Sequence, residues 1–175
     1  MNFFALFGLE ASYDIDTTKL AATYKSLAQV THPDKFSQSG GAEKLMAVQK
    51  NAQVNDGYQV LKNPLSRAEH LLSLRGIDMQ HETKTLQDPS FLMQQMEWRE
   101  SLEETSNAAD PEAALAALDA ELAIQTKLQY SQLADILKAD TEQANLDAAN
   151  RIRKLKFMEK LHREIELKED ALLDD

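Results

Sequence analysis

The chain has 175 residues, a length that suits one or two domains with a real hydrophobic core. Ala, Leu, Glu, Gln and Lys dominate while Gly and Pro are scarce, and this composition favours helices. Cysteine is absent, which excludes disulfides and thiolate metal sites and fits a cytoplasmic location. No stretch approaches the ~20 apolar residues that span a bilayer. The segment Met1-Asn2-Phe3-Phe4 lacks the basic start of a signal peptide, so a signal peptide is not expected. A membrane partner is not expected either.

The net charge of −10 is unevenly distributed along the chain. Residues 1–76 carry eight Lys/Arg and seven Asp/Glu, whereas residues 77–175 carry eleven Lys/Arg and twenty-two Asp/Glu. Such an asymmetry indicates two modules with different partners. Phosphate binding needs concentrated Lys and Arg, so the acidic module argues against nucleic acid as a partner.

The predicted elements of the N-terminal module are all helical. Apolar spacing and breaker residues predict a short helix over residues 3–7, a second from Asp16 to Pro33, a third from about Ala42 to Lys62, and a short one that stops at Gly76. A short loop joins the two long helices, so they should pair as an antiparallel hairpin with His32-Pro33-Asp34 at its tip. A glycine inside the third helix, Gly57, should cost about 1 kcal/mol relative to alanine.

Residues 77–88 are a polar connector with little periodicity, and we place the domain boundary there. Beyond Pro89, three amphipathic helices are predicted: one over residues 91–104, one that starts at Asp110-Pro111, and one that starts at Asp140. Three helices that each bury one stripe form a small antiparallel bundle. The expected fold is all-α, with an N-terminal domain over residues 1–76, a connector over 77–88 and a C-terminal bundle over 89–175.

The tripeptide at the hairpin tip has more than one explanation. Pro33 forbids helix continuation and biases His32 toward an extended backbone, so the motif can be a helix stop with Asp34 as a cap. Alternatively, His32 and Asp34 project from the turn and a partner protein contacts them. A hydrolase with a His32–Asp34 dyad is a third possibility, but a hairpin tip offers neither a third positioning group nor a pocket.

The helix predicted over residues 91–104 carries two stripes. The first stripe consists of Phe91, Trp98 and Leu102, at spacings of seven and four, and can supply the core by itself. The second consists of Met93, Met96, Glu97, Glu100 and Glu104. Leu92, Met93 and Met96 could instead pack in the protein core. The glutamates of this helix could simply form a solvent-exposed face. A methionine-rich patch with carboxylates at its edge is typical of a protein-binding face, and we favour this interpretation for the second stripe. Glu103 does not belong to the second stripe and is assigned to the solvent-exposed face.

Several ordered pieces of the N-terminal module resemble a J-domain: Asn2 to Leu9, Tyr24-Lys25, His32 to Lys35, and Val54 to Leu61. The rest of the chain is similar to the HscB family, the J-type co-chaperones of bacterial iron–sulfur cluster assembly. The pieces that carry this similarity are Arg67 to Gly76, Asp88 to Glu97, and Arg153 to Phe157. The Gly/Phe-rich linker and cysteine-rich zinc modules of generic J-proteins do not occur in this chain.

The resemblance implies two protein partners and no enzymatic activity, cofactor or bound metal. The J-domain would dock on HscA, a DnaK-class ATPase, and stimulate its hydrolysis through His32, Pro33, Asp34, Lys25 and Lys35. The bundle would bind the cluster scaffold IscU and deliver it, through Leu92, Met93, Met96, Glu97, Glu100, Glu104 and Phe157. A J-domain co-chaperone of another DnaK-class ATPase or another client is the nearest alternative.

The sequence departs from this family pattern in two places. Lys19 and Lys25 are the only cations in the second predicted helix, which is sparse for a J-domain. Electrostatic steering to the ATPase would therefore be weaker or differently placed. Gln94 and Trp98 stand where relatives often carry Glu and Leu, so the scaffold face should differ in detail.

Overall fold

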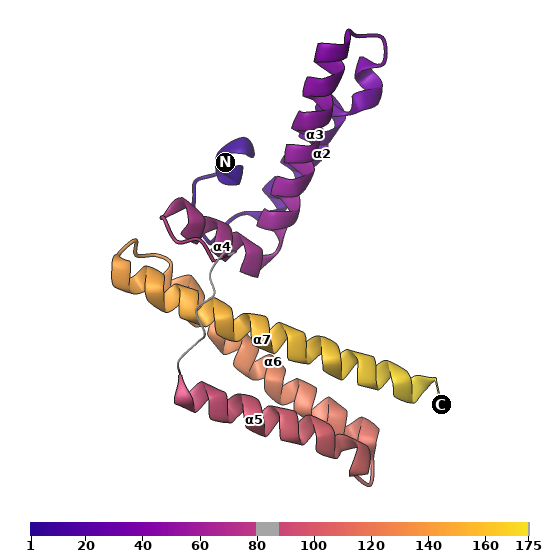
Figure 1. Cartoon of the computed structure of the whole chain (residues 1–175), viewed down its shortest axis with the longest axis vertical. Helices are drawn as coiled ribbons and strands as arrows, with labels where there is room; N and C mark the ends of the chain where they lie inside the picture. The colour runs from indigo at the N-terminus through magenta and orange to yellow at the C-terminus, as the bar shows by residue number, and fades with distance from the viewer. Residues whose placement is uncertain (80–87, 175) are drawn as a thin grey trace. The chain divides into compact units, whose positions relative to one another are not determined.

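The computed structural model describes residues 1–79 and 88–174 (Figure 1). Every regular element within these residues is a helix, which confirms the predicted all-α fold. The chain divides into two compact units, Met1–Gln80 and His81–Asp175, here called the N-terminal and C-terminal units. Most of the expected connector lies outside the described residues, although Met79 is buried against the N-terminal unit.

The N-terminal unit is built on a helical hairpin. Its elements are α1 (Phe3–Leu6), α2 (Thr17–Thr31), the 3-10 turn η1 (Pro33–Phe36), α3 (Gly41–Lys62) and α4 (Pro64–Leu74). Helices α2 and α3 run side by side in opposite directions (Figure 1). The carboxylate of Asp16 caps α2 by accepting the Lys19 N–H at 3.1 Å, as its position before the helix predicts.

The two long helices are held together by aromatic and amide contacts as well as by apolar packing. Tyr24 on α2 stacks on Tyr58 of α3 with ring centroids 4.1 Å apart. Its hydroxyl donates to Asn55 Oδ1 at 2.6 Å, and Asn55 in turn donates to Asn51. Asn51 donates to the Thr31 hydroxyl at 3.2 Å, so the hydrogen-bond chain continues to the last residue of α2. These side chains fix the hairpin up to the tripeptide at its tip.

Gly57 allows α1 to lie close against α3. A Cβ atom at this position would meet Phe3 Cδ1 at 2.8 Å and Phe7 Cε2 at 3.0 Å, closer than packed carbon atoms approach. We therefore expect Gly57→Ala to lower the free energy of unfolding by ~1–3 kcal/mol, because overpacking outweighs the gain of ~1 kcal/mol in helix propensity. Urea unfolding measures this, with Gly41→Ala as the control, since nothing lies within 4 Å of a Cβ there. Equal effects of the two substitutions would contradict the close packing.

His70 of α4 anchors the first residues of the chain. Its Nε2 atom accepts the Phe3 N–H at 3.0 Å, and its ring lies 4.9 Å from the ring of Phe3 and 5.5 Å from that of Phe4. Burial and the nearby N-terminal ammonium group lower the pKa of His70. Both causes favour the neutral ring, which is the form that can accept the Phe3 N–H.

This arrangement makes the stability of the N-terminal unit depend on pH. The pKa of His70 is lower in the folded chain, so its contribution is complete above the unfolded pKa of about 6.5 and is lost as the pH falls below it. A glutamine side chain at this position would still offer an acceptor but would not titrate. Thermal unfolding from about pH 7.5 to about pH 5 should therefore show a smaller loss of stability for His70→Gln than for the unsubstituted chain. Parallel pH profiles would contradict this role.

The C-terminal unit is a bundle of three helices. Its elements are α5 (Pro89–Glu104), the 3-10 turn η2 (Thr105–Asn107), α6 (Pro111–Ile136) and α7 (Glu142–Leu173). The core is filled by leucines of α6 and by an apolar stripe on α7: Leu115, Leu118, Leu122, Leu133, Ile152, Leu155, Met158, Leu161 and Ile165. None of the helices in residues 1–79 and 88–174 combines the length and hydropathy that a membrane crossing requires.

The predicted start of the last helix is wrong by one residue. Thr141 caps α7 by accepting the Ala144 N–H at 3.2 Å, whereas Asp140 accepts a hydrogen bond from the Asn145 side chain at 2.8 Å. Both residue types cap helices well, so spacing alone did not distinguish them.

An ion pair fixes the start of α5 against α7. Asp88 caps α5 by accepting the Phe91 N–H at 3.1 Å and pairs with the Lys154 ammonium at 2.9 Å. The hydrogen bond from Lys154 and then that from the Phe91 N–H hold the pKa of Asp88 below its ordinary value. The ion pair therefore fixes the position of α5 relative to α7 at the start of α5, which is also where the predicted scaffold face begins.

Candidate partner-binding sites

The tripeptide joins α2 to η1: His32 follows the last residue of α2, and Pro33 and Asp34 are the first two residues of η1. His32 has an extended backbone (φ −61°, ψ 129°), as the following proline requires, and its Nδ1 atom accepts the Asp34 N–H at 3.2 Å. The side chain that caps η1 is therefore His32 and not Asp34, which differs from the helix-stop explanation. The Asp34 side chain is 93% exposed. Its carboxylate is thus available to another molecule.

The geometry of His32 and Asp34 is not that of a catalytic dyad. Asp34 Oδ2 lies 3.6 Å from His32 Nδ1, beyond the hydrogen-bond reach of about 2.6–3.2 Å expected of a base and its partner. Both side chains are more than half exposed, so neither lies in a site that excludes water. Among the described residues, no three His, Asp or Glu side chains gather closely enough to hold a metal ion.

An open hollow of about 440 Å³ joins the side of α2 to the tip of the hairpin. Four of the five residues expected to contact an ATPase line it: Lys25, His32, Asp34 and Lys35. Tyr24 and Ala28 add apolar surface. Pro33 does not line the hollow but begins η1 and shapes the turn. One surface, which extends from the side of α2 to the tip, therefore combines apolar side chains with two cations and one anion.

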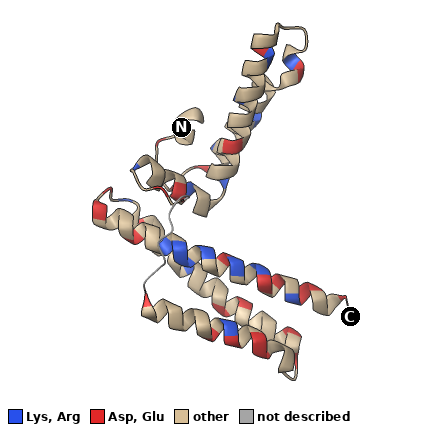
Figure 2. Cartoon of the chain, in the orientation of Figure 1, with Lys and Arg blue, Asp and Glu red and all other residues tan. Residues whose placement is uncertain are grey.

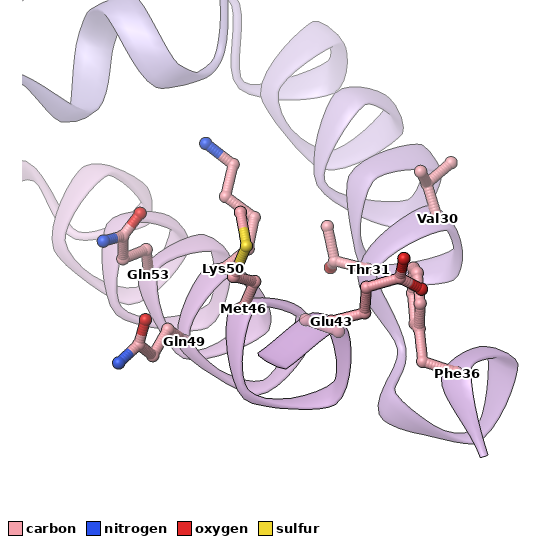
Figure 3. A pocket seen from close by; sticks show the side chains of 9 residues that line it. Val30, Thr31, Phe36, Glu43, Met46, Gln49, Lys50 and Gln53 are labelled. Atoms are coloured by element: carbon pink, nitrogen blue, oxygen red, sulfur yellow. The ribbon is translucent and has the colours of Figure 1, made fainter. Parts of the chain in front are cut away.

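A second hollow of about 480 Å³ lies between the end of α2, η1 and the first turns of α3 (Figure 3). Val30 and Met46, which face this hollow, are 64% and 68% exposed, and Phe36 lies beside them. This surface was not predicted from the sequence. Its signal was weak, because Val30 and Met46 are separated by the loop and belong to different helices.

The two stripes of α5 have different environments. Phe91, Trp98 and Leu102 are 8%, 3% and 4% exposed and pack in the core of the bundle. By contrast, Leu92 is 57% exposed, and Met93 and Met96 are each 64% exposed. Core packing therefore does not explain these last three residues. An exposed apolar cluster on a helix otherwise rich in carboxylates is typical of a protein-binding face.

A hollow of about 400 Å³ between α5 and α7, here called the aromatic hollow, brings part of the predicted scaffold face together. It is lined by Met96, Glu100 and Phe157, which were predicted, and by Gln95, Arg99 and Glu103, which were not. The exposed carboxylates of Glu97 and Glu104 lie on α5 outside this lining, as do Leu92 and Met93. From the sequence, Glu103 was assigned to a solvated helix face and not to the scaffold face. Its spacing of seven residues from Met96 was the signal that could have placed it.

Phe157 connects the aromatic hollow to the core. Its ring meets Phe91 edge-on at 5.9 Å and stacks on Trp98 at 6.4 Å with an interplanar angle of 15°. The Arg99 guanidinium lies 5.4 Å from the centre of the same ring and forms an ion pair with Glu164. Half-buried Phe157 is therefore a core residue and a surface residue at once. Arg99 and Glu164 hold its exposed edge in place.

The helical hairpin with His-Pro-Asp at its tip is a J-domain-type fold, so the chain is a J-type protein with an added helical bundle. It belongs to the HscB family of co-chaperones. Over 174 residues and 99% of each chain it is 58% identical to the co-chaperone HscB homologue of Pseudoalteromonas atlantica. It is 53% identical to that of a Shewanella species over 175 residues, 99% of this chain and all of the relative.

Family-model and structural comparisons agree with this assignment. Residues 87–166 match the HSCB C-terminal oligomerisation domain. The structure of chaperone HscB from Vibrio cholerae matches with a TM-score of 0.87 and 46% identity, over 98% of this chain and 99% of that one. Human co-chaperone HscB matches with a TM-score of 0.86 and 30% identity, over 96% of this chain and 82% of the human chain.

Proposed function

We propose that this chain is a co-chaperone of iron–sulfur cluster assembly that links two proteins. Its J-domain, residues 1–76, stimulates an HscA-type ATPase, and its bundle, residues 89–175, binds an IscU-type scaffold and delivers it for cluster transfer to acceptor proteins. The observation that carries the proposal is the presence of one exposed candidate surface on each unit, the tip of the hairpin and the outer face of α5. Membership of the HscB family supports the same pair of partners.

The tip suits contact with an ATPase for two physical reasons. The exposed Asp34 carboxylate can accept a charge-assisted hydrogen bond from a cationic side chain of the partner. Pro33 and the His32–Asp34 hydrogen bond already order the turn, so less conformational entropy is lost on docking. Lys25 and Lys35 flank the carboxylate and would attract an acidic surface.

The outer face of α5 suits a folded protein partner. Leu92, Met93 and Met96 supply exposed apolar area, and methionine side chains adapt to a partner's shape. Glu97, Glu100 and Glu104 add negative charge, so the complementary surface should be basic around an apolar centre. Phe157 offers a rigid aromatic edge beside them, of the kind that often dominates the energy of an interface.

The covalent chemistry in this proposal belongs to the partners. The chain has no Gly-rich phosphate loop, so ATP is hydrolysed by the ATPase. It has no cysteine, so the cluster remains on thiolates of the scaffold. The proposed setting is the cytoplasm, where such thiols stay reduced.

The test measures ATP hydrolysis by HscA with this chain alone, with IscU alone and with both. We expect the two together to stimulate more than the sum of their separate effects, because the chain would bring scaffold and ATPase into one complex. Stimulation by the chain without any effect of IscU, together with no heat of binding to IscU in calorimetry, would favour the alternative of another client. Absence of any stimulation would contradict the assigned ATPase.

A further inference from the structure

Methionine supplies all the sulfur in this chain, which has six methionines and no cysteine. Two of the six, Met79 and Met158, are buried, at 8% and 1% exposure. Of the four exposed methionines, two lie together on the outer face of α5, Met93 and Met96. Half of the methionines that a dissolved oxidant can reach therefore lie on the proposed scaffold face.

Met93 and Met96 lie in the uncharged part of α5. Residues 89–96 contain no Asp, Glu, Lys or Arg, and Figure 2 shows the first turns of this helix in tan, with its charged residues further along. Residues three apart lie on one side of a helix, so the two thioethers are neighbours. Met96 also lines the aromatic hollow with Phe157. Together with exposed Leu92, the two methionines supply the apolar centre of the face.

We propose that Met93 and Met96 form an oxidation switch that controls binding of the scaffold. A two-electron oxidant such as hydrogen peroxide transfers one oxygen atom to each thioether sulfur. In each transfer the O–O bond breaks, an S–O bond forms, the sulfur loses two electrons, and the second oxygen leaves with both protons as water. The product, methionine sulfoxide, is polar and chiral, whereas methionine is flexible and apolar. The switch rests on the proposed function, because it regulates the scaffold face.

The sulfoxide weakens this face for two physical reasons. Its oxygen is hydrated in the free chain, and covering it with a partner costs free energy unless the partner supplies a hydrogen-bond donor. The oxidised side chain also loses the apolar, polarisable sulfur that adapts methionine to a partner's shape. Burial of one methionine side chain is worth about tenfold or more in affinity. Oxidation of both should therefore lower scaffold affinity by at least about tenfold.

Oxidation of this pair leaves the bundle folded. The core side of α5 consists of Phe91, Trp98 and Leu102, none of which contains sulfur, and Met158 in the core is shielded by burial. The new oxygen atoms on the exposed side of α5 stay in water, so the folded chain tolerates them. Methionine sulfoxide reductases return two electrons and two protons to each sulfoxide and release its oxygen as water. The modification is thus reversible, as a switch requires.

The ATPase contact is spared, because none of the residues proposed for it contains sulfur. Of the exposed methionines of the N-terminal unit, Met46 lines the separate hollow between α2 and α3, and Met1 begins the chain. Oxidation therefore separates the two activities of the co-chaperone. The oxidised chain should still stimulate HscA by itself, but IscU should no longer add to the stimulation.

The test compares scaffold affinity before and after oxidation of the full chain. The chain is treated with hydrogen peroxide, the peroxide is removed before IscU is added, and the dissociation constant is measured by calorimetry. Mass spectrometry should find one added oxygen on each of Met93 and Met96 and none on Met79 or Met158, and circular dichroism should show an unchanged fold. We expect binding to weaken at least about tenfold, and treatment with methionine sulfoxide reductases to restore it.

The matched variant that resists oxidation is Met93→Leu/Met96→Leu, because leucine is apolar and has no sulfur. The quantity compared is the ratio of the dissociation constants of the same protein after and before treatment, so an effect of leucine on the unoxidised contact cancels. This ratio should be about one for the leucine variant. Met46→Leu keeps both methionines of α5 and should show the same loss as the unsubstituted chain.

Unchanged affinity of the treated chain would overturn the switch, whether or not its two methionines carry oxygen. An equal loss in Met93→Leu/Met96→Leu would also overturn it, because the effect would then arise elsewhere in the chain. In both cases the proposed function stands, since the unoxidised chain binds IscU. Loss of stimulation of HscA by the oxidised chain alone would contradict the separation of the two activities. An unoxidised chain without affinity for IscU would contradict the proposed function and the switch together.

Discussion

Asp34→Asn is expected to abolish stimulation of the partner ATPase while leaving the fold intact. The Asp34 side chain is 93% exposed; its backbone N–H donates to His32 Nδ1, and its carboxylate lies 3.6 Å from the same nitrogen. The amide keeps the size of the side chain and removes its charge, so stability should change by no more than about 0.5 kcal/mol. A hydrogen bond to a charged group contributes about 1.5–3 kcal/mol, and each 1.4 kcal/mol is tenfold in affinity.

Steady-state ATP hydrolysis by HscA as a function of co-chaperone concentration measures the effect. Asp56→Asn is the matched control, because Asp56 is an exposed aspartate of α3 in the same unit and outside the tip. We expect this control to stimulate like the unsubstituted chain. Stimulation by Asp34→Asn at the level of the control would remove Asp34 from the ATPase contact.

The tip could be predicted from the sequence because its residues are neighbours in the chain. Pro33 restricts the backbone of His32 to an extended conformation. The two flanking helices are recognisable in the sequence from the N-cap Asp16 and from the spacing of their apolar residues. What the sequence left open was the role of Asp34, which depends on whether its side chain caps the next turn. The structure decides this through one hydrogen bond, from the Asp34 N–H to His32.

The face of the bundle was only partly predictable, because it is assembled from distant segments. The exposure of Met93 and Met96 follows from a second stripe on one helix, which spacing reveals. The aromatic hollow needs Phe157, about fifty residues beyond α5, and Arg99, whose direction is set by Glu164 on α7. No periodicity within α5 could show which of its flanks faces α7.

The close approach at Gly57 illustrates the same limit in the N-terminal unit. From the sequence, Gly57 can be recognised only as a glycine that weakens its helix. The need for a glycine there comes from the close packing of Phe3 and Phe7, which lie about fifty residues earlier in the chain. Local rules thus predicted where most helices begin and end, with α7 displaced by one residue, and long-range contacts determined what the helix faces touch.

The triple change of Leu92, Met93 and Met96 to alanine should remove scaffold binding without unfolding the bundle. All three side chains are more than half exposed, and the core stripe of α5 is supplied by Phe91, Trp98 and Leu102. Loss of exposed side chains costs little stability, and alanine favours the helix. Each apolar side chain that becomes buried on binding contributes about 1.5–3 kcal/mol, so affinity should fall by at least about a hundredfold.

Calorimetric titration of IscU and urea unfolding, run on the same protein, separate the two explanations for these residues. Ile124→Ala/Leu128→Ala is the matched surface control, because both side chains are exposed on α6 at 68% and 48% and lie outside the aromatic hollow. It should bind the scaffold normally. Trp98→Ala is the core control and should lose about 3–5 kcal/mol of stability. If the triple variant unfolds as easily as Trp98→Ala and still binds the scaffold with full affinity, its three residues belong to the core.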